Sequence, residues 1–253
     1  MKVTFLGTGT SQGVPVIACN CEVCLSGNFK DKRLRSSIMI ATEETTVVID
    51  SGPDFRYQML REKVQHLDAL VFTHEHKDHI AGMDDVRAFN YKQQAALEVY
   101  ASEAVQNALK REFYYIFSDF KYPGIPLINL NTIGTEGFTI GDITLTPIEV
   151  MHYKLPVLSF RINDFTYITD AKTVSDEEIE KIKGSKILVV NALQREKHIS
   201  HFTLQEAIDF IEVIAPEKAY LTHISHKLGK HEDVLKELPS YIELAYDGLQ
   251  IDI

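Results

Sequence analysis

The segment THEHKDH, residues 73–79, constrains this chain more than any other part of it. It follows DALVFT, an apolar run typical of a buried strand, so His74 and His76 come where that strand ends. Two positions apart on an extended backbone, their imidazoles face the same side, and Asp78 and His79 lie on the next turn. Any two of these residues would fit a solvated turn. All four in this order predict a metal site at the carboxyl end of a strand, with enough donors for two neighbouring ions.

Strand-like and helix-like segments alternate along both halves of the chain, with no linker between them. This arrangement favours one α/β domain over residues 1–253, with two sheets in the middle and helices outside. Strands are expected at 2–7, 36–41, 45–52, 68–73, 97–101, 138–150, 155–170, 186–193 and 218–223, and a terminal hairpin at 242–253 turning at Asp247-Gly248. Helices are expected at 53–64, 83–92, 102–113, 175–184, 202–216 and 231–239, and residues 113–126 as an aromatic-rich irregular segment.

Further strand-ending motifs extend the pattern across the chain. They are VVIDSG with Asp50, EVMHYK with His152, YITDAK with Asp170 and YLTHIS with His223. In this order, and with HEHKDH, they resemble the metallo-β-lactamase superfamily. The resemblance implies a four-layer αββα sandwich of two mixed β-sheets flanked by helices. It also implies the metal ligands: His74, His76 and His152 on one divalent ion, Asp78, His79 and His223 on a second, and Asp170 bridging them. Asp50 would orient the loop that carries these histidines, because a buried carboxylate next to a metal-binding histidine fixes its tautomer.

The chemistry implied by two such ions is hydrolysis of a phosphodiester. Two metals lower the pKa of a shared water and clamp the anionic oxygens, but the departing alkoxide still needs a proton. ISHFTL places His201 where the family's phosphodiesterases and tRNA-processing nucleases have a general-acid histidine. His198 is the rival candidate, and an exposed helix cap is the ordinary reading of either residue. The ligand set accepts zinc, manganese or iron.

All three cysteines of the chain lie within ACNCEVC, residues 18–24. An odd number of thiols this close together argues against disulfides, because neighbouring pairs would close strained rings, and in a reducing cytosol such a cluster more often binds metal. The preceding GTGTSQGVP has the spacing of a loose dinucleotide fingerprint. However, no helix follows it, and it lacks the Lys-Ser/Thr of a phosphate-binding loop, so we read it as a tight turn near the metals.

The glycine loop followed directly by the cysteines resembles the phosphodiesterases of the carbon–phosphorus lyase pathway, which open a phosphoribosyl cyclic phosphate. In that family a cysteine trio and a late histidine bind a structural zinc. The resemblance implies a zinc site made of Cys19, Cys21, Cys24 and His226. His231 is an alternative fourth ligand, and an iron–sulfur cluster or simple packing stay open as well. LAYDG near the carboxyl end is similar too, whereas residues 113–126 match no motif.

Net charge and hydropathy limit the kinds of binding partner expected for this protein and its location in the cell. A net charge of −10 opposes broad electrostatic binding of nucleic acid. No apolar run approaches the roughly 18 residues of a membrane-spanning helix, and the amino terminus does not supply the apolar core of a signal peptide. We therefore expect a cytoplasmic enzyme acting on a small phosphodiester, with cyclic ones among the candidates. A homodimer is expected because related hydrolases often dimerise. The alternatives are a tRNA 3′-processing endonuclease, which normally carries a Gly/Pro-rich arm not visible in the sequence, and a metal-binding protein without turnover.

Overall fold

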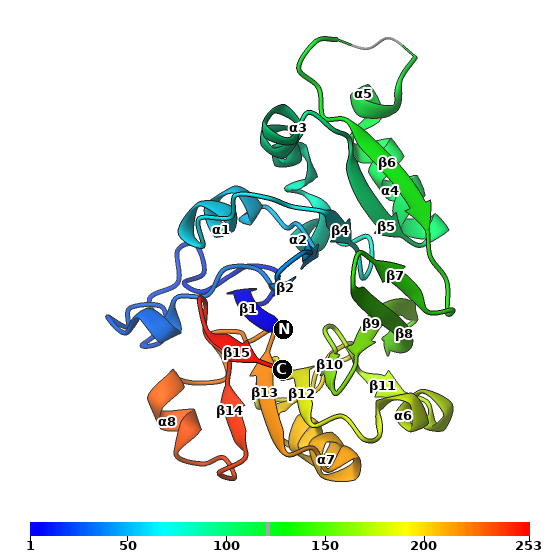
Figure 1. The fold of residues 1–253 in the computed structure, drawn as a ribbon. Helices are drawn as coiled ribbons and strands as arrows, with labels where there is room; N and C mark the ends of the chain where they lie inside the picture. Colours follow the sequence, from blue (N-terminus) through cyan, green and yellow to red (C-terminus); the bar gives the residue numbers. More distant parts are fainter. Residues whose placement is uncertain (120–121) are drawn as a thin grey trace.

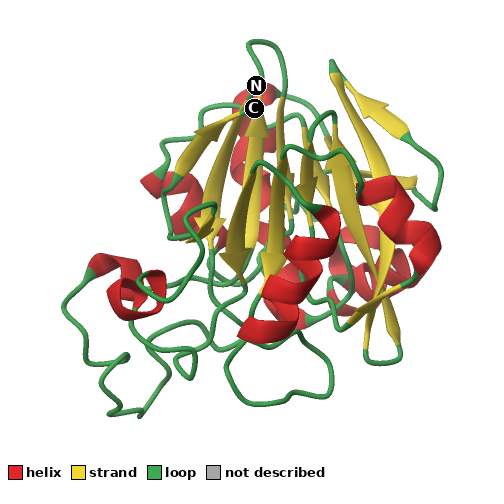
Figure 2. Ribbon diagram, turned by 90° about the horizontal axis from the view of Figure 1, so that it is seen from below, coloured by secondary structure: helices red, strands yellow, loops and turns green. Residues whose placement is uncertain are grey.

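Two β-sheets pack face to face and helices cover the outer surface of each (Figure 1), a layering that is also clear in the view from below (Figure 2). The structure is a computed structural model that describes residues 1–119 and 122–253. The four-layer αββα sandwich of two mixed sheets expected from the sequence is confirmed.

The first sheet combines antiparallel and parallel strands. Its spatial order is β15 (Gln250–Asp252), β1 (Lys2–Gly7), β2 (Ser37–Ala41), β3 (Thr46–Ile49), β4 (Ala69–Val71), β5 (Leu97–Ala101) and β6 (Ile128–Thr132). The pairs from β15 to β3 are antiparallel and those from β3 to β6 are parallel. Because β3 to β6 run the same way, their carboxyl ends form one edge, where residues that follow these strands meet.

The second sheet is also mixed. Its order is β11 (Thr173–Val174), β8 (Ile143–His152), β9 (Leu155–Ile162), β10 (Phe165–Tyr167), β12 (Ile187–Asn191), β13 (Lys218–Thr222) and β14 (Ile242–Leu244), with β7 (Phe138–Ile140) paired to β8. The four neighbouring strands β10, β12, β13 and β14 are parallel to one another. Alternate side chains of both sheets point inward and form a buried apolar layer, in which the rings of Phe5 and Tyr220 lie 5.8 Å apart.

Helices close the two outer faces. On the first sheet lie α1 (Phe55–Arg61), α2 (Lys77–Ile80), the 3₁₀ helix η2 (Met83–Val86), α3 (Arg87–Gln93), α4 (Glu103–Glu112) and α5 (Tyr114–Phe117); on the second lie α6 (Asp176–Ile182), α7 (Leu204–Ile214) and α8 (His231–Leu235). The short 3₁₀ helix η1 (Phe29–Asp31) lies apart from these faces, with Asp31 accepting from the His231 amide. Sequence accounts for their starts: Ser102 accepts from the Val105 amide, and Thr203 with Glu206 forms a capping box.

Two expectations about helices need refinement. The helix expected at 83–92 is divided into η2 and α3, and the segment expected to be irregular at 113–126 contains the short helix α5. Residues 120 and 121 of that segment lie outside the described residues. None of the helices in the described ranges is long and apolar enough to cross a membrane.

The terminal hairpin predicted at 242–253 was wrong. The turn at Asp247-Gly248 exists, with Gly248 at φ +89°, but β14 pairs with β13 in the second sheet and β15 pairs with β1 in the first. Asp247 fixes this crossing, since its carboxylate accepts from the backbone amides of Thr8 (2.9 Å) and Leu34 (2.7 Å). The turn residue is therefore held by the amino-terminal loop instead of closing a local hairpin.

Candidate metal centre

The predicted ligands converge on one edge of the sandwich. His74, His76, Asp78 and His79 follow β4, and His152 ends β8. Asp170 follows β10 and His223 follows β13, so both sheets contribute. Donor atoms of His74, His79 and Asp170, and likewise of Asp78, His79 and His223, lie within 4.8 Å of one another.

One group of imidazoles comprises His74, His76 and His152. His74 Nε2 lies 3.1 Å from His76 Nδ1, and the rings of His76 and His152 are 5.2 Å apart. His152 Nδ1 donates to the backbone carbonyl of Ser200 at 2.8 Å, which leaves its Nε2 as the nitrogen able to accept a metal. Nothing else in the described residues pairs with His74 Nε2 or His76 Nδ1, so the two nitrogens face each other as ligands of one ion would.

The second group centres on His79 and Asp170. His79 Nε2 lies 3.2 Å from Asp78 Oδ2 and 3.3 Å from Asp170 Oδ2, and the same oxygen is 3.3 Å from His223 Nδ1. His79 Nε2 is buried and makes no well-directed hydrogen bond among the described residues. Imidazoles and carboxylates that converge in this way, around a buried nitrogen without a well-directed hydrogen bond, fit a divalent cation. The assignment of each residue to a particular ion stays a prediction.

Asp50 lies directly behind this group and is fully buried. Its Oδ2 accepts from Thr73 Oγ1 at 2.8 Å and lies 2.7 Å from His79 Nδ1, while its Oδ1 accepts from the Thr73 amide at 2.9 Å. Burial alone would lower the pKa of His79, but the carboxylates of Asp50, Asp170 and Asp78 outweigh it and raise that pKa well above its usual value. A cation at Nε2 would therefore displace a proton.

Backbone conformation and a serine also hold the site. Asp50, Asp170 and His223 have left-handed φ angles of +66°, +57° and +53°, unusual for residues other than glycine. Ser36 donates to the carbonyl of Gly9 at 3.0 Å, and its Oγ lies 3.2 Å from His223 Nδ1. Sequence reasoning missed Ser36, since a serine before a strand carries no signal. The glycine loop does lie beside the metal ligands, as expected.

His201 lies within the same cluster. Its ring is 4.4 Å from that of His152 and 4.8 Å from that of His223, and its Nδ1 is 3.7 Å from Asp170 Oδ1. Burial, followed by the nearby His223, lowers the pKa of His201 to about 2. The imidazole is therefore neutral without substrate, and it could act as an acid only where the negative charge of a bound substrate raises its pKa. The position also fits a ligand, because donors of His152, Asp170 and His201 lie within 4.8 Å of one another.

His198 lies further out than His201. The two rings are 5.2 Å apart, and His198 Nδ1 contacts Ser200 Oγ at 3.3 Å. Burial lowers its pKa as well. His198 belongs to none of the donor clusters found in the described residues. Of the two histidines, His201 therefore lies nearer to the predicted metal ligands.

The three thiols and His226 form a second cluster. His226 Nδ1 lies 3.3 Å from Cys19 Sγ, 3.4 Å from Cys21 Sγ and 3.5 Å from Cys24 Sγ. A tetrahedral zinc ion with ordinary Zn–S and Zn–N bonds separates sulfur from nitrogen by about 3.5 Å. The Cys24 amide donates to Cys21 Sγ and lowers the pKa of Cys21 to about 6, whereas burial raises that of Cys24 to about 11. The cluster fits a closed zinc site.

The alternative fourth ligand, His231, lies elsewhere. Its Nδ1 is 3.2 Å from Arg33 Nη2, and its backbone amide donates to Asp31 Oδ1 at 2.7 Å. His231 thus belongs to a buried network around Arg33, and the structure places His226 beside the thiols instead. Since His226 follows His223 by three residues, the cluster ties the amino-terminal loop to one wall of the metal centre.

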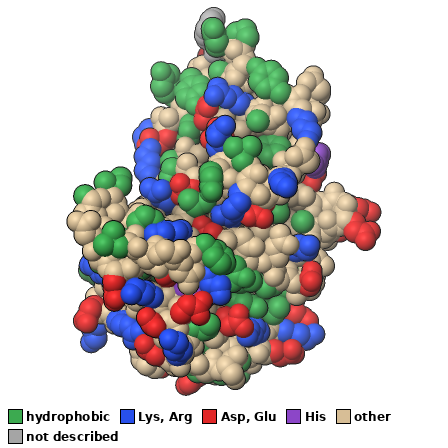
Figure 3. All heavy atoms as spheres, turned by 90° about the vertical axis from the view of Figure 1, so that its left-hand side faces the viewer, with side chains coloured by type: hydrophobic (Ala, Val, Ile, Leu, Met, Phe, Trp, Pro, Cys, Tyr) green, Lys and Arg blue, Asp and Glu red, His purple; other side chains and the backbone are tan. Residues whose placement is uncertain are grey.

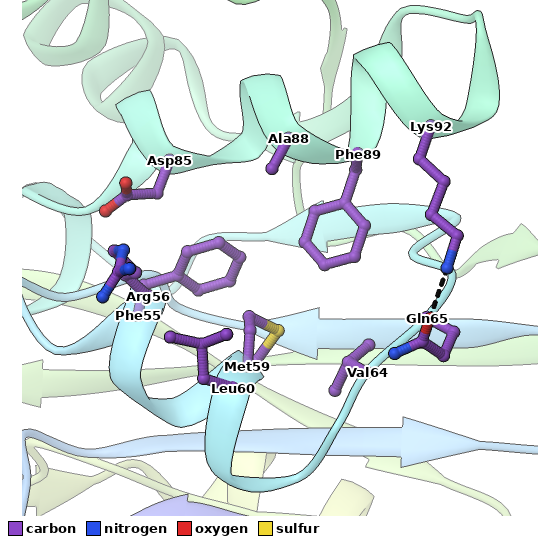
Figure 4. A pocket seen from close by; sticks show the side chains of 10 residues that line it. All are labelled: Phe55, Arg56, Met59, Leu60, Val64, Gln65, Asp85, Ala88, Phe89 and Lys92. Carbon is purple, nitrogen blue, oxygen red and sulfur yellow. Dashed lines mark hydrogen bonds between the residues drawn. The ribbon is translucent and has the colours of Figure 1, made fainter.

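A separate hollow of about 340 Å³ lies between α1 and α3 (Figure 4). Phe55, Met59 and Phe89 supply apolar walls, while Arg56 and Lys92 stand at its rim. None of the predicted ligands lines it, and it contains no cluster of metal-binding side chains. Chemistry in the described part of the chain is therefore concentrated at the sheet edge and not in this hollow.

Comparison with known proteins agrees with this geometry. Residues 45–224 match the family model of the beta-lactamase superfamily domain. A crystal structure described as a new diphosphatase from the PhnP family shares 36% identity and superposes with a TM-score of 0.94, covering 100% of this chain and 97% of that one.

Two curated relatives extend the comparison. An octanoyltransferase from Porphyromonas gingivalis is 39% identical over 99% of this chain, which spans 51% of that protein, about half its length. A ribonuclease Z from Nostoc sp. is 23% identical, with 98% of this chain and 70% of that protein covered. By its family match, its fold and its converging histidines and aspartates, the chain belongs to the beta-lactamase superfamily of metal-dependent hydrolases, close to the PhnP family.

Proposed function

We propose that this chain is a metal-dependent phosphodiesterase that hydrolyses small phosphodiesters. The observation that carries the proposal is the convergence of His74, His79 and Asp170 with Asp78 and His223, beside His201, whose buried Nδ1 makes no hydrogen bond among the described residues. Two divalent ions held there would supply a nucleophilic water and charge neutralisation for the phosphate. The relatives described as a PhnP-family diphosphatase and a ribonuclease Z support phosphorus–oxygen chemistry.

The chain's own residues would orient the metal-binding histidines and transfer the proton. Asp50 holds the Nδ1 proton of His79, so that Nε2 faces the site, and Ser200 does the same for His152 through its carbonyl. Asp170 lies between the two groups of imidazoles, as a bridging ligand would. His201, 3.7 Å from Asp170 and buried, delivers a proton to the leaving oxygen once the substrate's negative charge favours its protonated form.

The test is turnover by protein of known metal content. We expect cleavage of bis(p-nitrophenyl) phosphate, followed by a comparison of ribose cyclic phosphates with open and diphosphate diesters. Full metal loading without cleavage of any phosphodiester would overturn the proposal. An octanoyl thioester belongs in the same series, because one relative is named an octanoyltransferase. Its hydrolysis in preference to every phosphodiester would assign the site to acyl chemistry.

Nuclease activity is the second candidate, supported by the ribonuclease Z relative. Against it stands the net charge of −10. Over the face drawn in Figure 3, acidic and basic side chains are interspersed, without a continuous basic band that would follow a phosphate backbone. Cleavage of a tRNA precursor faster than of bis(p-nitrophenyl) phosphate would favour the nuclease.

The donor atoms of the two clusters also indicate which metal ions this protein would hold. Zinc or manganese suits the mixed nitrogen and oxygen donors, iron is the remaining candidate, and a structural zinc suits the thiol cluster. Metal analysis of protein purified without added metal decides among them. We further propose a cytoplasmic enzyme whose partner is a small phosphodiester, and a homodimer, which sedimentation would detect.

A further inference from the structure

A cavity of about 490 Å³ opens directly beside the metal centre. Its lining includes two of the predicted ligands, His76 and His152, together with Tyr153, Lys154, Leu155 and Ile199. A substrate whose phosphate lies at the histidines would therefore extend part of its structure across the latter four. What these side chains can recognise determines the class of substrate.

Tyr153 occupies a conformation that its side chain disfavours. Tyr153 and Lys154 form the two-residue connection between β8 and β9, where His152 pairs with Leu155, and Tyr153 has φ +58°. Hairpin positions of this kind favour glycine or asparagine, and bulky residues there are uncommon. The ring is nevertheless 52% exposed. A strained residue with an exposed ring beside metal ligands indicates a binding role.

Ile199 also lines the cavity. It is 65% exposed, and it precedes Ser200, whose carbonyl accepts from His152 Nδ1 at 2.8 Å. That hydrogen bond fixes the Ile199 segment relative to the metal centre. An exposed aromatic ring and an exposed aliphatic side chain lining one cavity suit a flat, largely apolar group, such as a nucleobase.

Lys154 adds a positive charge to this cavity. Its Nζ lies 5.4 Å from the centre of the Tyr153 ring, so one ligand can contact both. No ion pair holds Lys154 among the interactions of the described residues, whereas many other lysines of this acidic protein are paired. An unpaired ammonium beside a metal centre suits a phosphate group.

We propose that Tyr153 and Ile199 bind a nucleobase while Lys154 pairs with an adjacent phosphate, so that the substrate is a nucleotide-type phosphodiester. The proposal rests on the phosphodiesterase function, because base and scissile phosphate belong to one molecule. Tyr153 and Ile199 are specificity-determining residues in this arrangement. Proton transfer remains with the histidine cluster.

The turnover test compares two chromogenic substrates that share a leaving group, thymidine 5′-monophosphate p-nitrophenyl ester and methyl p-nitrophenyl phosphate. Stacking of one base contributes about 1–3 kcal/mol, so Tyr153→Gly should lower the ratio of their kcat/KM values by about fivefold to hundredfold. Glycine suits the left-handed φ, so the variant should fold. Tyr153→Phe should keep the ratio, and Tyr57→Ala, at an exposed tyrosine on α1, serves as the matched control. An unchanged ratio in Tyr153→Gly overturns the proposal.

A binding test separates failure of this site from failure of the proposed function. AMP and ribose 5-phosphate differ only in the base, and calorimetry with metal-loaded protein measures both. We expect AMP to bind more tightly, Tyr153→Gly to abolish the difference, and Lys154→Met to weaken both ligands alike. A Tyr153-dependent preference for AMP without any turnover would support the site and overturn the phosphodiesterase. Turnover of the methyl substrate without a preference for AMP would do the reverse.

Discussion

Asp50→Asn replaces the most enclosed carboxylate beneath the metal centre by an amide of the same shape. Asparagine tolerates the left-handed φ of +66° at this position, so the substitution should not strain the backbone. The carboxylate faces three donors: the Thr73 amide at Oδ1, and Thr73 Oγ1 and His79 Nδ1 at Oδ2. An amide offers only one oxygen, so one of its two ends must meet a donor with its own NH₂ group.

Each orientation of the amide has a definite cost. With the oxygen at the Oδ2 position, the NH₂ group opposes the Thr73 amide, and a buried donor without an acceptor costs about 1–3 kcal/mol. With the NH₂ group at the Oδ2 position, it donates to His79 Nδ1, which moves the proton to Nε2 and blocks the metal-facing nitrogen. We therefore expect a loss of about 1–3 kcal/mol in stability, together with a metal affinity lowered about 10- to 100-fold.

Two measurements check this expectation. Urea denaturation of metal-stripped protein reports the stability, and competition with a chromophoric chelator reports the affinity. Asp164→Asn is the matched control, since that carboxylate is 55% exposed and pairs with Lys186. An Asp50→Asn protein with the stability and metal affinity of the control would refute the role assigned to Asp50.

Four further predictions concern single groups. His201→Ala should lower kcat about 10²- to 10⁴-fold for diesters with alkoxide leaving groups, and much less for p-nitrophenyl esters, whose leaving group needs no proton; equal losses would contradict general-acid catalysis. His226→Ala should lose one zinc per chain and unfold at a lower temperature, and an unchanged metal content would exclude His226 as a ligand. Metal added to stripped protein at neutral pH should release protons because the pKa of His79 is raised, and calorimetric heats independent of the buffer would contradict this. Burial raises the pKa of Asp247 to about 6. The protonated carboxyl group therefore stabilises the folded state below about pH 4, and this stabilisation is lost as the pH rises through 6. Asp247→Asn should remove this pH dependence from the denaturation midpoint.

Local signals predicted the elements well but could not identify distant partners. The amphipathic run at 202–216 became α7, because its cap and its apolar face are both encoded locally. The turn at Asp247-Gly248 was also real, yet β15 continues into the other sheet, where β1 offers its free edge. A turn motif specifies a change of direction, whereas the choice of strand partner depends on residues far away in the sequence.

The same distinction applies to the site. Ordered motifs predicted that the residues from His74 to His223 would lie together, and the structure brings them to one edge because each follows or ends a strand there. The resemblance favoured His226 over His231, but only the coordinates show that His226 lies beside the thiols while His231 contacts Arg33, because the two histidines are five residues apart in one polar segment. Tyr153 went unnoticed for a different reason: its strained φ depends on the two-residue connection between β8 and β9, which only the strand register establishes. Ser36 depends likewise on tertiary packing.

The pairing of β1 with β15 has a consequence for how the chain folds. Lys2 lies opposite Asp252 and Ile253 donates to the carbonyl of Met1 at 2.9 Å, so β1 lacks the partner on this edge until residues 250–252 have been made. Figure 1 shows the two ends of the chain side by side. Contacts this remote in sequence slow folding, and an open strand edge invites pairing with other chains during synthesis. Deleting residues 250–253 should therefore cause more aggregation of the nascent chain than the substitution of any single predicted metal ligand does.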